Sequence, residues 1–276
     1  MVTPTYLPDL KRCEVLAESL DRTNPDVPHY LIVDRCDHSA FKHLEGRKRR
    51  IIESEALLGR WIWRTPTAKG YWLSLRAPPV RGWILQQILK IAAIEAVAEQ
   101  ILVFCDSDTA FIRGFGRDDL MVNGKIGLLD VEFAGHAEWT ATARRLLGLP
   151  KDNRAGSRNY VGNMICWDRD TVKAMQQRIA AVSGVDWKVA LARTPRFSEY
   201  MIYGVFVSEL LGYAASPHAP SSVPLVKPSW DISLSTDASL AAFFSGVDPK
   251  TVAIMIHSKD GVDPVRYRRH LEQWWS

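Results

Sequence analysis

Apolar runs that end on polar or acidic residues alternate along this chain with segments of helical periodicity. The runs cover residues 1–6, 29–34, 100–108, 124–133, 160–168 and 251–260. Residues 7–20 have apolar side chains at helical spacing, and residues 81–97 carry them on one helix face. Strands that alternate with helices predict an α/β fold with a mainly parallel central sheet flanked by helices. No repeat or linker interrupts the pattern, so we expect one domain over residues 1–276.

The second half of the chain has its own turn and helix signals. Asn123 and Gly124 form a typical turn dipeptide. Ser198 is the expected N-cap of a helix over residues 199–212, and a terminal amphipathic helix is expected over residues 263–275. The turn opens the predicted strand at residues 124–133, and the terminal helix follows the predicted strand at residues 251–260.

The polar ends of the strands are the candidate functional positions. In a parallel sheet, ligands bind beyond the carboxyl ends of the strands, where Asp34, Asp106, Asp108 and His257 are expected to lie. The run "ILVFCDSDTAF" places Asp106 and Asp108 directly after a buried strand, with Ser107 between them. Two carboxylates so spaced can bind Mg²⁺ or Mn²⁺ together with a diphosphate. The alternative is an Asx-type turn in which one carboxylate caps the next segment.

Composition narrows the class of protein. The chain has 35 Lys and Arg against 31 Asp and Glu, and a net charge of +4 suits an anionic ligand or membrane surface without implying nucleic acid. Residues 40–54 hold much of the positive charge, and we expect a solvated helix or loop there.

The cysteines and the absence of a long apolar segment bear on location. The four cysteines form no C-x-x-C pair, which argues against a zinc ribbon or a disulfide framework and suggests a reducing compartment. Pro4, Pro8 and Asp9 interrupt any apolar leader, and no segment is apolar for long enough to span a bilayer. We expect a cytoplasmic protein, with contact at the inner face of the membrane left open.

Several of these segments together resemble a known family. "VFCDSD" resembles the D-x-D motif of GT-A-fold glycosyltransferases that use nucleotide sugars. "GWILQQILKIAA", "FSEYMIYG" and "IHSKD" are similar to segments of the bacterial polysaccharide and glycolipid type, some of unassigned function. The resemblance implies a single GT-A-like, Rossmann-like domain with a nucleotide-binding half in residues 1–110 and an acceptor-binding half in residues 111–276. It also implies a divalent cation, Mn²⁺ or Mg²⁺, a UDP-sugar donor, and a glycan or lipid-linked acceptor.

The resemblance also assigns candidate roles to residues. The metal ligands would be Asp106, Asp108 and His257, although a lone histidine at a strand end is more often an ordinary polar residue. Gly162 and Asn163 would meet the acceptor. Lys259 would bind the diphosphate, and Asp34 or Asp37 would accept the uracil imide proton. The full set of expected donor contacts is Thr5, Tyr6, Asp34, Asp37, Trp83, Gln87, Lys90, Ser107 and Lys259.

Glu199 is the candidate catalytic residue. At the start of a helix its negative charge is stabilised by the helix dipole, and the resemblance implies a general base for an inverting transfer. The alternative is that Glu199 only caps the helix. No second carboxylate is evident beside Glu199 in the sequence, so inversion is favoured only weakly over retention.

Two other classes of function remain open. A metal-dependent nuclease or phosphotransferase could use the same acidic residues and bind phosphates with the "GRKRR" of residues 46–50. A non-catalytic nucleotide-sugar-binding module would leave Glu199 dispensable. A P-loop enzyme is excluded because the G-x-x-x-x-G-K-[ST] motif is missing, and "RGFGRDD" lacks the third glycine of a dinucleotide fingerprint.

The C-terminal segment suggests one further activity. Arg266, Arg268, Arg269 and His270 precede Trp274 and Trp275, a combination typical of an interfacial helix on anionic lipid. The alternative is that the tryptophans fold back onto the core. Weak, salt-sensitive binding to anionic vesicles is therefore a prediction for this tail.

Overall fold

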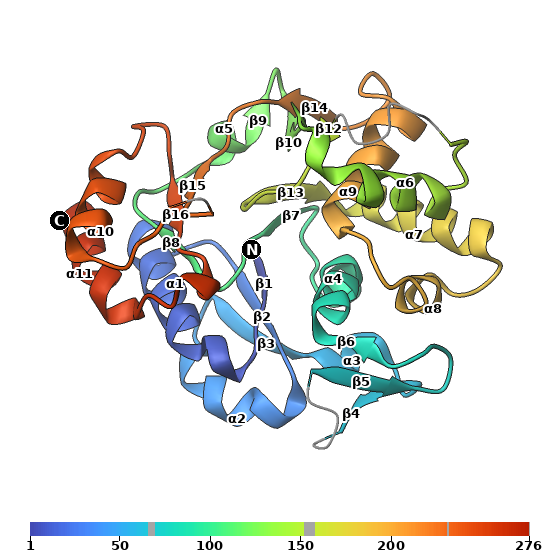
Figure 1. The fold of residues 1–276 in the computed structure, drawn as a ribbon, viewed down its shortest axis with the longest axis horizontal. Coiled ribbons are helices and arrows are strands. Elements are labelled where there is room, and N and C mark those ends of the chain that lie inside the picture. Colours follow the sequence, from blue (N-terminus) through green and yellow to red (C-terminus); the bar gives the residue numbers. More distant parts are fainter. Residues whose placement is uncertain (66–69, 152–157, 231, 276) are drawn as a thin grey trace.

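The computed structural model describes residues 1–65, 70–151, 158–230 and 232–275, and its centre is a five-stranded sheet (Figure 1). The strand order is β13-β7-β1-β2-β3. Neighbouring strands β7, β1, β2 and β3 run parallel, and β13 runs antiparallel to β7. The strands are β1 (Val2–Pro4), β2 (His29–Val33), β3 (Arg49–Glu53), β7 (Ile101–Phe104) and β13 (Ile165–Asp168).

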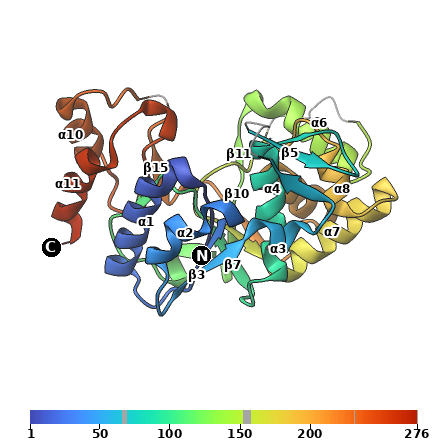
Figure 2. The ribbon, with the colours of Figure 1, turned by 90° about the horizontal axis from the view of Figure 1, so that it is seen from below.

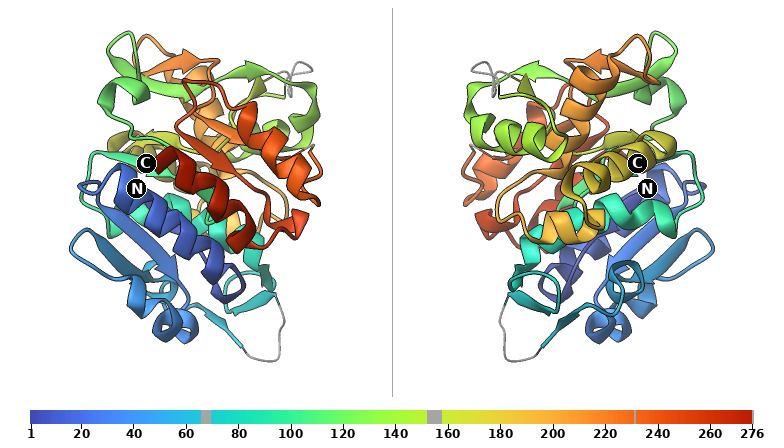
Figure 3. Two further views of the ribbon diagram at one scale, coloured as in Figure 1. Left: turned by 90° about the vertical axis from the view of Figure 1, so that its left-hand side faces the viewer. Right: turned by 90° about the vertical axis from the view of Figure 1, so that its right-hand side faces the viewer.

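Helices cover both faces of this sheet. Successive side chains of a strand point to opposite faces, so the apolar strands present two apolar faces for helices to cover. Leu31 and Val33 pack with Cys13 of α1 (Leu10–Thr23). Ile32 packs instead in the larger cluster that contains α4 (Gly82–Ala92). Figure 3 shows α1 on one side of the molecule and α4 with α7 (Arg169–Ser183) on the other. The α/β fold with a mainly parallel sheet is confirmed.

Smaller sheets surround the central one. Their strands are β4 (Ile62–Arg64), β5 (Tyr71–Ser74), β6 (Val80–Arg81), β8 (Thr109–Phe111), β9 (Met121–Val122), β10 (Lys125–Leu129), β11 (Val131–Glu132), β12 (Arg158–Asn159), β14 (His218–Ser221), β15 (Val226–Pro228) and β16 (Ala253–Met255). The remaining α-helices are α2 (His38–Phe41), α3 (Ser54–Leu58), α5 (Arg117–Leu120), α6 (Ala137–Leu146), α8 (Trp187–Ala192), α9 (Glu199–Val205), α10 (Asp237–Ser245) and α11 (Pro264–Trp275). Figure 2 shows α10 and α11 beside α1 at one end of the molecule and α7 and α8 at the other.

The helix and turn signals in the second half are confirmed. The Ser198 hydroxyl accepts a hydrogen bond from the backbone N–H of Met201, so Ser198 caps α9. The helix continues as a π-helical segment, Phe206–Leu211, and ends at Gly212 with a positive φ of 74°. Asn123 and Gly124 also have positive φ values, 51° and 76°, and join β9 to β10 in a tight hairpin.

The expectation for residues 40–54 was wrong in part. The segment ends in β3, an edge strand of the central sheet, and Arg49 is buried instead of solvated. Its guanidinium pairs with Asp21 at 2.6 Å and donates to the ring nitrogen Nδ1 of His29 at 3.0 Å. Because every neighbour of this cation is an acceptor, the charge is tolerated inside the structure, which the composition could not reveal.

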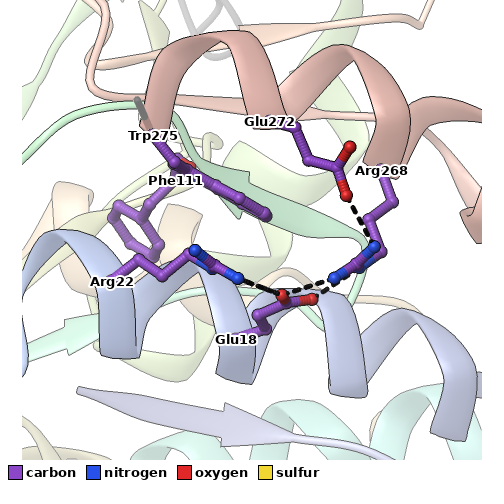
Figure 4. Close-up of polar contacts among 6 residues, drawn as sticks. All are labelled: Glu18, Arg22, Phe111, Arg268, Glu272 and Trp275. Atoms are coloured by element: carbon purple, nitrogen blue, oxygen red, sulfur yellow. Dashed lines mark hydrogen bonds and ion pairs between the residues drawn. The ribbon is translucent and has the colours of Figure 1, made fainter.

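The terminal helix α11 packs against α1 (Figure 4). Arg268 donates to Glu18 of α1 at 2.7 Å, and the indole N–H of Trp275 donates to the carbonyl of Phe111 at 3.0 Å. Arg22 lies over the Trp275 ring, 4.9 Å from its centroid. Trp275 therefore folds back onto the core, as the alternative reading of the tail anticipated.

Other tail residues divide between core and solvent. Tyr267 and Leu271 are buried, whereas Trp274 is 40% exposed. Arg266 pairs with Asp237 at 2.8 Å, so this cation and Arg268 already have acidic partners. Binding to vesicles stays an untested prediction. Among the helices that the structure describes, none combines the length and hydropathy that a membrane span requires.

Candidate active site

A cavity of about 820 Å³ lies beyond the carboxyl ends of β1, β2 and β7. Every candidate residue except Asp37 lines this cavity. Asp37 instead accepts a hydrogen bond from the backbone N–H of Leu7. The predicted residues in its wall are Thr5, Tyr6, Asp34, Trp83, Gln87, Lys90, Asp106, Ser107, Asp108, Gly162, Asn163, Glu199, His257 and Lys259. Residues far apart in the sequence thus meet at one edge of the sheet.

The acidic pair after β7 has two different environments. The Asp106 side chain is 47% exposed and its Oδ1 lies 2.9 Å from Nζ of Lys90. Asp108 accepts a hydrogen bond from the backbone N–H of Ser258 at 3.2 Å. Burial and the nearby charge of Asp106 raise the pKa of Asp108 to about 7. Excess negative charge at this point is what a bound cation would offset.

Strand pairing brings His257 to the same edge. Strand β16 pairs antiparallel with β8, which directly follows the D-S-D segment, and Ile256 donates its N–H to the Asp108 carbonyl at 3.0 Å. His257 and Lys259 therefore line the cavity next to Asp108. The side-chain ligand atoms of Asp106, Asp108 and His257 are not gathered within 4.8 Å of one another in the part of the chain that the structure describes. The metal centre remains a prediction.

A different set of residues brings its potential metal-ligating atoms together. Among the described residues, the atoms of Asp34, Cys36 and Asp37 all lie within 4.8 Å of one another. A guanidinium already occupies their centre, because Arg64 lies 2.9 Å from Asp34 and 3.5 Å from Asp37. This cluster is a salt bridge that fastens the β4–β5 hairpin to the end of β2. Asp34 also accepts a hydrogen bond from Ser54, and burial raises its pKa.

Lys90 of α4 is the centre of a buried polar network. Its Nζ lies 3.0 Å from Glu199, 2.9 Å from Asp106 and 3.0 Å from the hydroxyl of Tyr200. Burial opposes its charge, yet the charges of Asp106 and Glu199 outweigh burial and raise the pKa of Lys90 well above its usual value. The helix α4 and the helix α9 are thereby joined through one ammonium group.

Glu199 begins α9, as expected, and its side chain is only 5% exposed. Its backbone N–H donates to the side-chain carbonyl of Gln87 at 3.1 Å, which accounts for the placement of Gln87 in the wall. The expectation that no second carboxylate lies beside Glu199 was wrong, since Asp106 shares the same lysine. Asp106 and Glu199 are far apart in the sequence, so no local pattern could predict that both contact Lys90.

The opposite wall contains Gly162 and Asn163. The Oδ1 atom of Asn163 is buried and has no hydrogen-bond partner among the described residues. A buried acceptor without a partner has a desolvation cost, so this position is energetically unfavourable in the protein as it stands. Trp83 opens α4 at the cavity mouth, where it is 49% exposed and lies 6.1 Å, centroid to centroid, from Trp139.

Sequence reasoning missed several residues of the cavity wall. Asp9 accepts a hydrogen bond from Ser107 at 3.3 Å, and its charge contributes to the raised pKa of Asp108. Arg64, Trp139 and Trp230 also line the cavity. Asp9 follows the first predicted strand, so its position was a usable signal. The other side chains reach the wall through long-range packing, which no local pattern reports.

The chain is similar to solved structures of glycosyltransferases. An active site mutant of LgtC is 11% identical, with a TM-score of 0.50, and the match covers 99% of this chain and 94% of that one. The galactosyltransferase LgtC in complex with donor and acceptor sugar analogs is 10% identical, with a TM-score of 0.48 and coverage of 99% and 94%. Mouse xyloside xylosyltransferase 1, in its apo form, is 10% identical, with a TM-score of 0.46 and coverage of 95% and 98%.

At such low identity the LgtC match shows the fold alone, and the fold is of the GT-A type. No curated protein matches the sequence. Residues 2–219 match the family described as "Family of unknown function (DUF6492)", and the chain belongs to this family.

Proposed function

We propose that this member of the DUF6492 family is a metal-dependent glycosyltransferase. It would move a sugar from a nucleotide sugar, a UDP-sugar by the resemblance of its motifs, to a hydroxyl group of a glycan or glycolipid. The observation that carries the proposal is the meeting of Asp106 and Asp108 with Glu199 and Asn163 in one cavity of about 820 Å³. That volume suits a ligand as large as a nucleotide sugar.

The acidic edge of the cavity fits a divalent cation. Asp106, Asp108 and His257 would hold it, because Mg²⁺ and Mn²⁺ accept carboxylate ligands and the Asp106 side chain is open to the cavity. Asp106 and Asp108 follow the same strand end and both line the cavity, so a cation bound there would offset the repulsion between the two carboxylates. When bound, the cation would neutralise charge on the diphosphate leaving group.

The remaining wall supplies contacts for the donor. Lys259 lines the cavity and would add positive charge near the diphosphate, and Ser107, also in the wall, would contact the ribose. Thr5, Tyr6 and Asp34 follow the first two strands, where the nucleoside would lie. Asp37 would act indirectly, by holding the backbone of Leu7 and the side chain of Arg64.

Glu199 is the candidate general base. It would accept the proton of the acceptor hydroxyl while that oxygen attacks the anomeric carbon and the bond to the diphosphate breaks. The Lys90 ammonium lies 3.0 Å from the Glu199 carboxylate, which would have to contact both this ammonium and the acceptor hydroxyl. Because Glu199 would act as a base on the acceptor hydroxyl, the proposal favours inversion at the anomeric carbon.

The rival classes lose part of their support. A nuclease or phosphotransferase was expected to use "GRKRR", but Arg49 is buried against Asp21, and residues 46–50 do not line the cavity. Incubation with UDP-sugars and Mn²⁺, with measurement of UDP release, separates the classes. UDP release that stops in excess chelator supports the transferase. A protein that binds UDP tightly but produces no UDP from UDP-sugars would be a binding module. Cleavage of phosphodiesters without production of UDP from UDP-sugars would indicate the nuclease.

A further inference from the structure

A second cavity of about 300 Å³ adjoins the candidate active site. The two cavities share Val161, Gly162, Asn163 and Trp230 in their walls. The second cavity extends from this shared wall between β10, β13 and the segment 221–226. A molecule whose reacting group lay near Asn163 could therefore extend its other end into this space.

The wall of the second cavity is mainly aliphatic. Its apolar side chains include Leu120, Val122, Leu129, Val131, Met164, Ile165, Val223, Pro224, Leu225 and Val226. Among the described residues that line it there is no lysine, arginine or histidine, and Asp119 is its one acid. The polar side chains of the wall are Asp119, Asn159, Asn163, Ser221 and Ser222, and the apolar side chains outnumber them, so most of an occupant's surface would meet apolar atoms. The chemistry of the wall selects an apolar occupant.

The kinds of side chain in the wall favour a hydrocarbon chain as the occupant. Branched aliphatic side chains surround the space, and the one aromatic residue in the described wall, Trp230, lies where the two cavities join. A flexible hydrocarbon chain can follow such a space and bury its methylene groups, each of which gains from leaving water. Asn163 adds one polar residue to the wall at the junction.

We propose that the second cavity is a subsite for the aliphatic chain of the acceptor. The inference rests on the proposed glycosyltransferase function and specifies its acceptor as an amphiphile, with a hydroxyl near Asn163 and a hydrocarbon tail. The hydroxyl lies in the larger cavity with its proton directed to Glu199, which lines that cavity. The tail passes Trp230 and lies against Leu129 and Val223.

The matched pair Val223 and Val265 tests the assignment. Val223 is 53% exposed at the lip of the second cavity, and Val265 is 55% exposed on α11, in the wall of neither cavity. Val223→Asp and Val265→Asp make the same chemical change at similar exposure. Both variants should retain the wild-type melting temperature, because an exposed valine contributes little to the core.

The probes are butyl, hexyl and octyl β-D-glucopyranoside, kept below the concentrations at which they form micelles. Calorimetry without nucleotide or metal should show affinity rising by about fourfold per added methylene until the cavity is full. Val223→Asp should lower octyl glucoside affinity more than tenfold, and Val265→Asp should leave it unchanged. Affinity independent of chain length, or equal effects of the two variants, would overturn the subsite.

The binding assay is independent of turnover, which keeps the two proposals separable. Chain-dependent binding without any UDP release from UDP-sugars would overturn the glycosyltransferase function while the cavity still binds chains. UDP release without chain-dependent binding would overturn the acceptor subsite alone.

Discussion

The ammonium of Lys90 lies 3.0 Å from the carboxylate of Glu199 inside the wall of the cavity. Both side chains are nearly removed from solvent, at 8% and 5% exposure. The same ammonium contacts Asp106 at 2.9 Å, so one lysine balances an acid from the candidate metal site and the candidate base. A single substitution at Lys90 should therefore disturb stability and both functional groups.

Replacing Lys90 by methionine should destabilise the protein by about 3 kcal/mol, because removing one partner of a buried ion pair leaves the other charge uncompensated. The double variant Lys90→Met with Glu199→Gln should recover part of this loss, since the buried negative charge is then gone. Urea unfolding of the two single variants and the double variant gives the coupling free energy between Lys90 and Glu199. Arg196→Met is the control, because its pair with Glu138 is exposed and should contribute less than about 1 kcal/mol.

Asp108→Ala should abolish UDP release while the metal-free protein stays as stable as the wild type or becomes more stable. The folded pKa of Asp108, about 7, lies above its ordinary value of 3.8, so its ionisation opposes folding as pH rises through that interval. The stability gain of the variant should be present at pH 8 and absent below pH 4. Asp26→Ala, at a carboxylate that is 88% exposed, is the control. Full turnover by the wild type in excess chelator would contradict the metal assignment.

His218 should make the protein sensitive to acid. Burial lowers its pKa to about 4 from the usual 6.5, and its Nε2 lies 2.6 Å from the Tyr203 hydroxyl. The unfolded chain then binds a proton that the folded protein does not, so stability is complete above pH 6.5 and falls by about 3 kcal/mol as pH drops to 4.

Urea unfolding at several pH values, with His218→Gln, tests this linkage. Glutamine can still accept a hydrogen bond from Tyr203 but does not titrate, so the slope of stability between pH 6.5 and 4 should become shallower. His43→Gln, at a side chain that is 52% exposed, should leave the slope unchanged. An identical slope in all three proteins would remove His218 as the source.

The sequence predicted four of the five strands of the central sheet, because apolar runs such as Ile101–Phe104 must be buried. It missed β3, whose basic residues concealed the strand, and it did not show that the runs at 124–133 and 251–260 form β10 and β16 of smaller sheets. Asp34 and Asp106 line one cavity because parallel strands end at one edge of the sheet. The pairing of β16 with β8, which brings His257 beside Asp108, depends on long-range contacts. So does the pairing of Lys90 with Glu199, because no local periodicity relates α4 to α9.

The terminal helix should contribute mainly to stability. Leu271→Ala should cost about 2–5 kcal/mol, because Leu271 is fully buried and its removal leaves a cavity between α11 and the body of the protein. Trp274→Ala, at a side chain that is 40% exposed, should cost much less. Thermal unfolding compares the two. Equal, small effects would mean that α11 is not packed as described, and the vesicle-binding prediction for the tail would then gain support.

Glu199→Gln should retain UDP and Mn²⁺ affinity and lose transfer by a factor of about 10² to 10⁴, because an amide cannot accept the acceptor proton. The amide oxygen can still accept a hydrogen bond from Lys90, so the helix packing should survive, as a thermal unfolding curve would confirm. Glu138→Gln is the matched control, since its carboxylate is 62% exposed. If Glu199 is the base, its protonation lowers the wild-type rate at acidic pH. Glutamine does not titrate, so this fall in rate at acidic pH should be absent from the variant. Transfer within a few-fold of the wild type would leave Glu199 with the structural role of anchoring Lys90 at the start of α9.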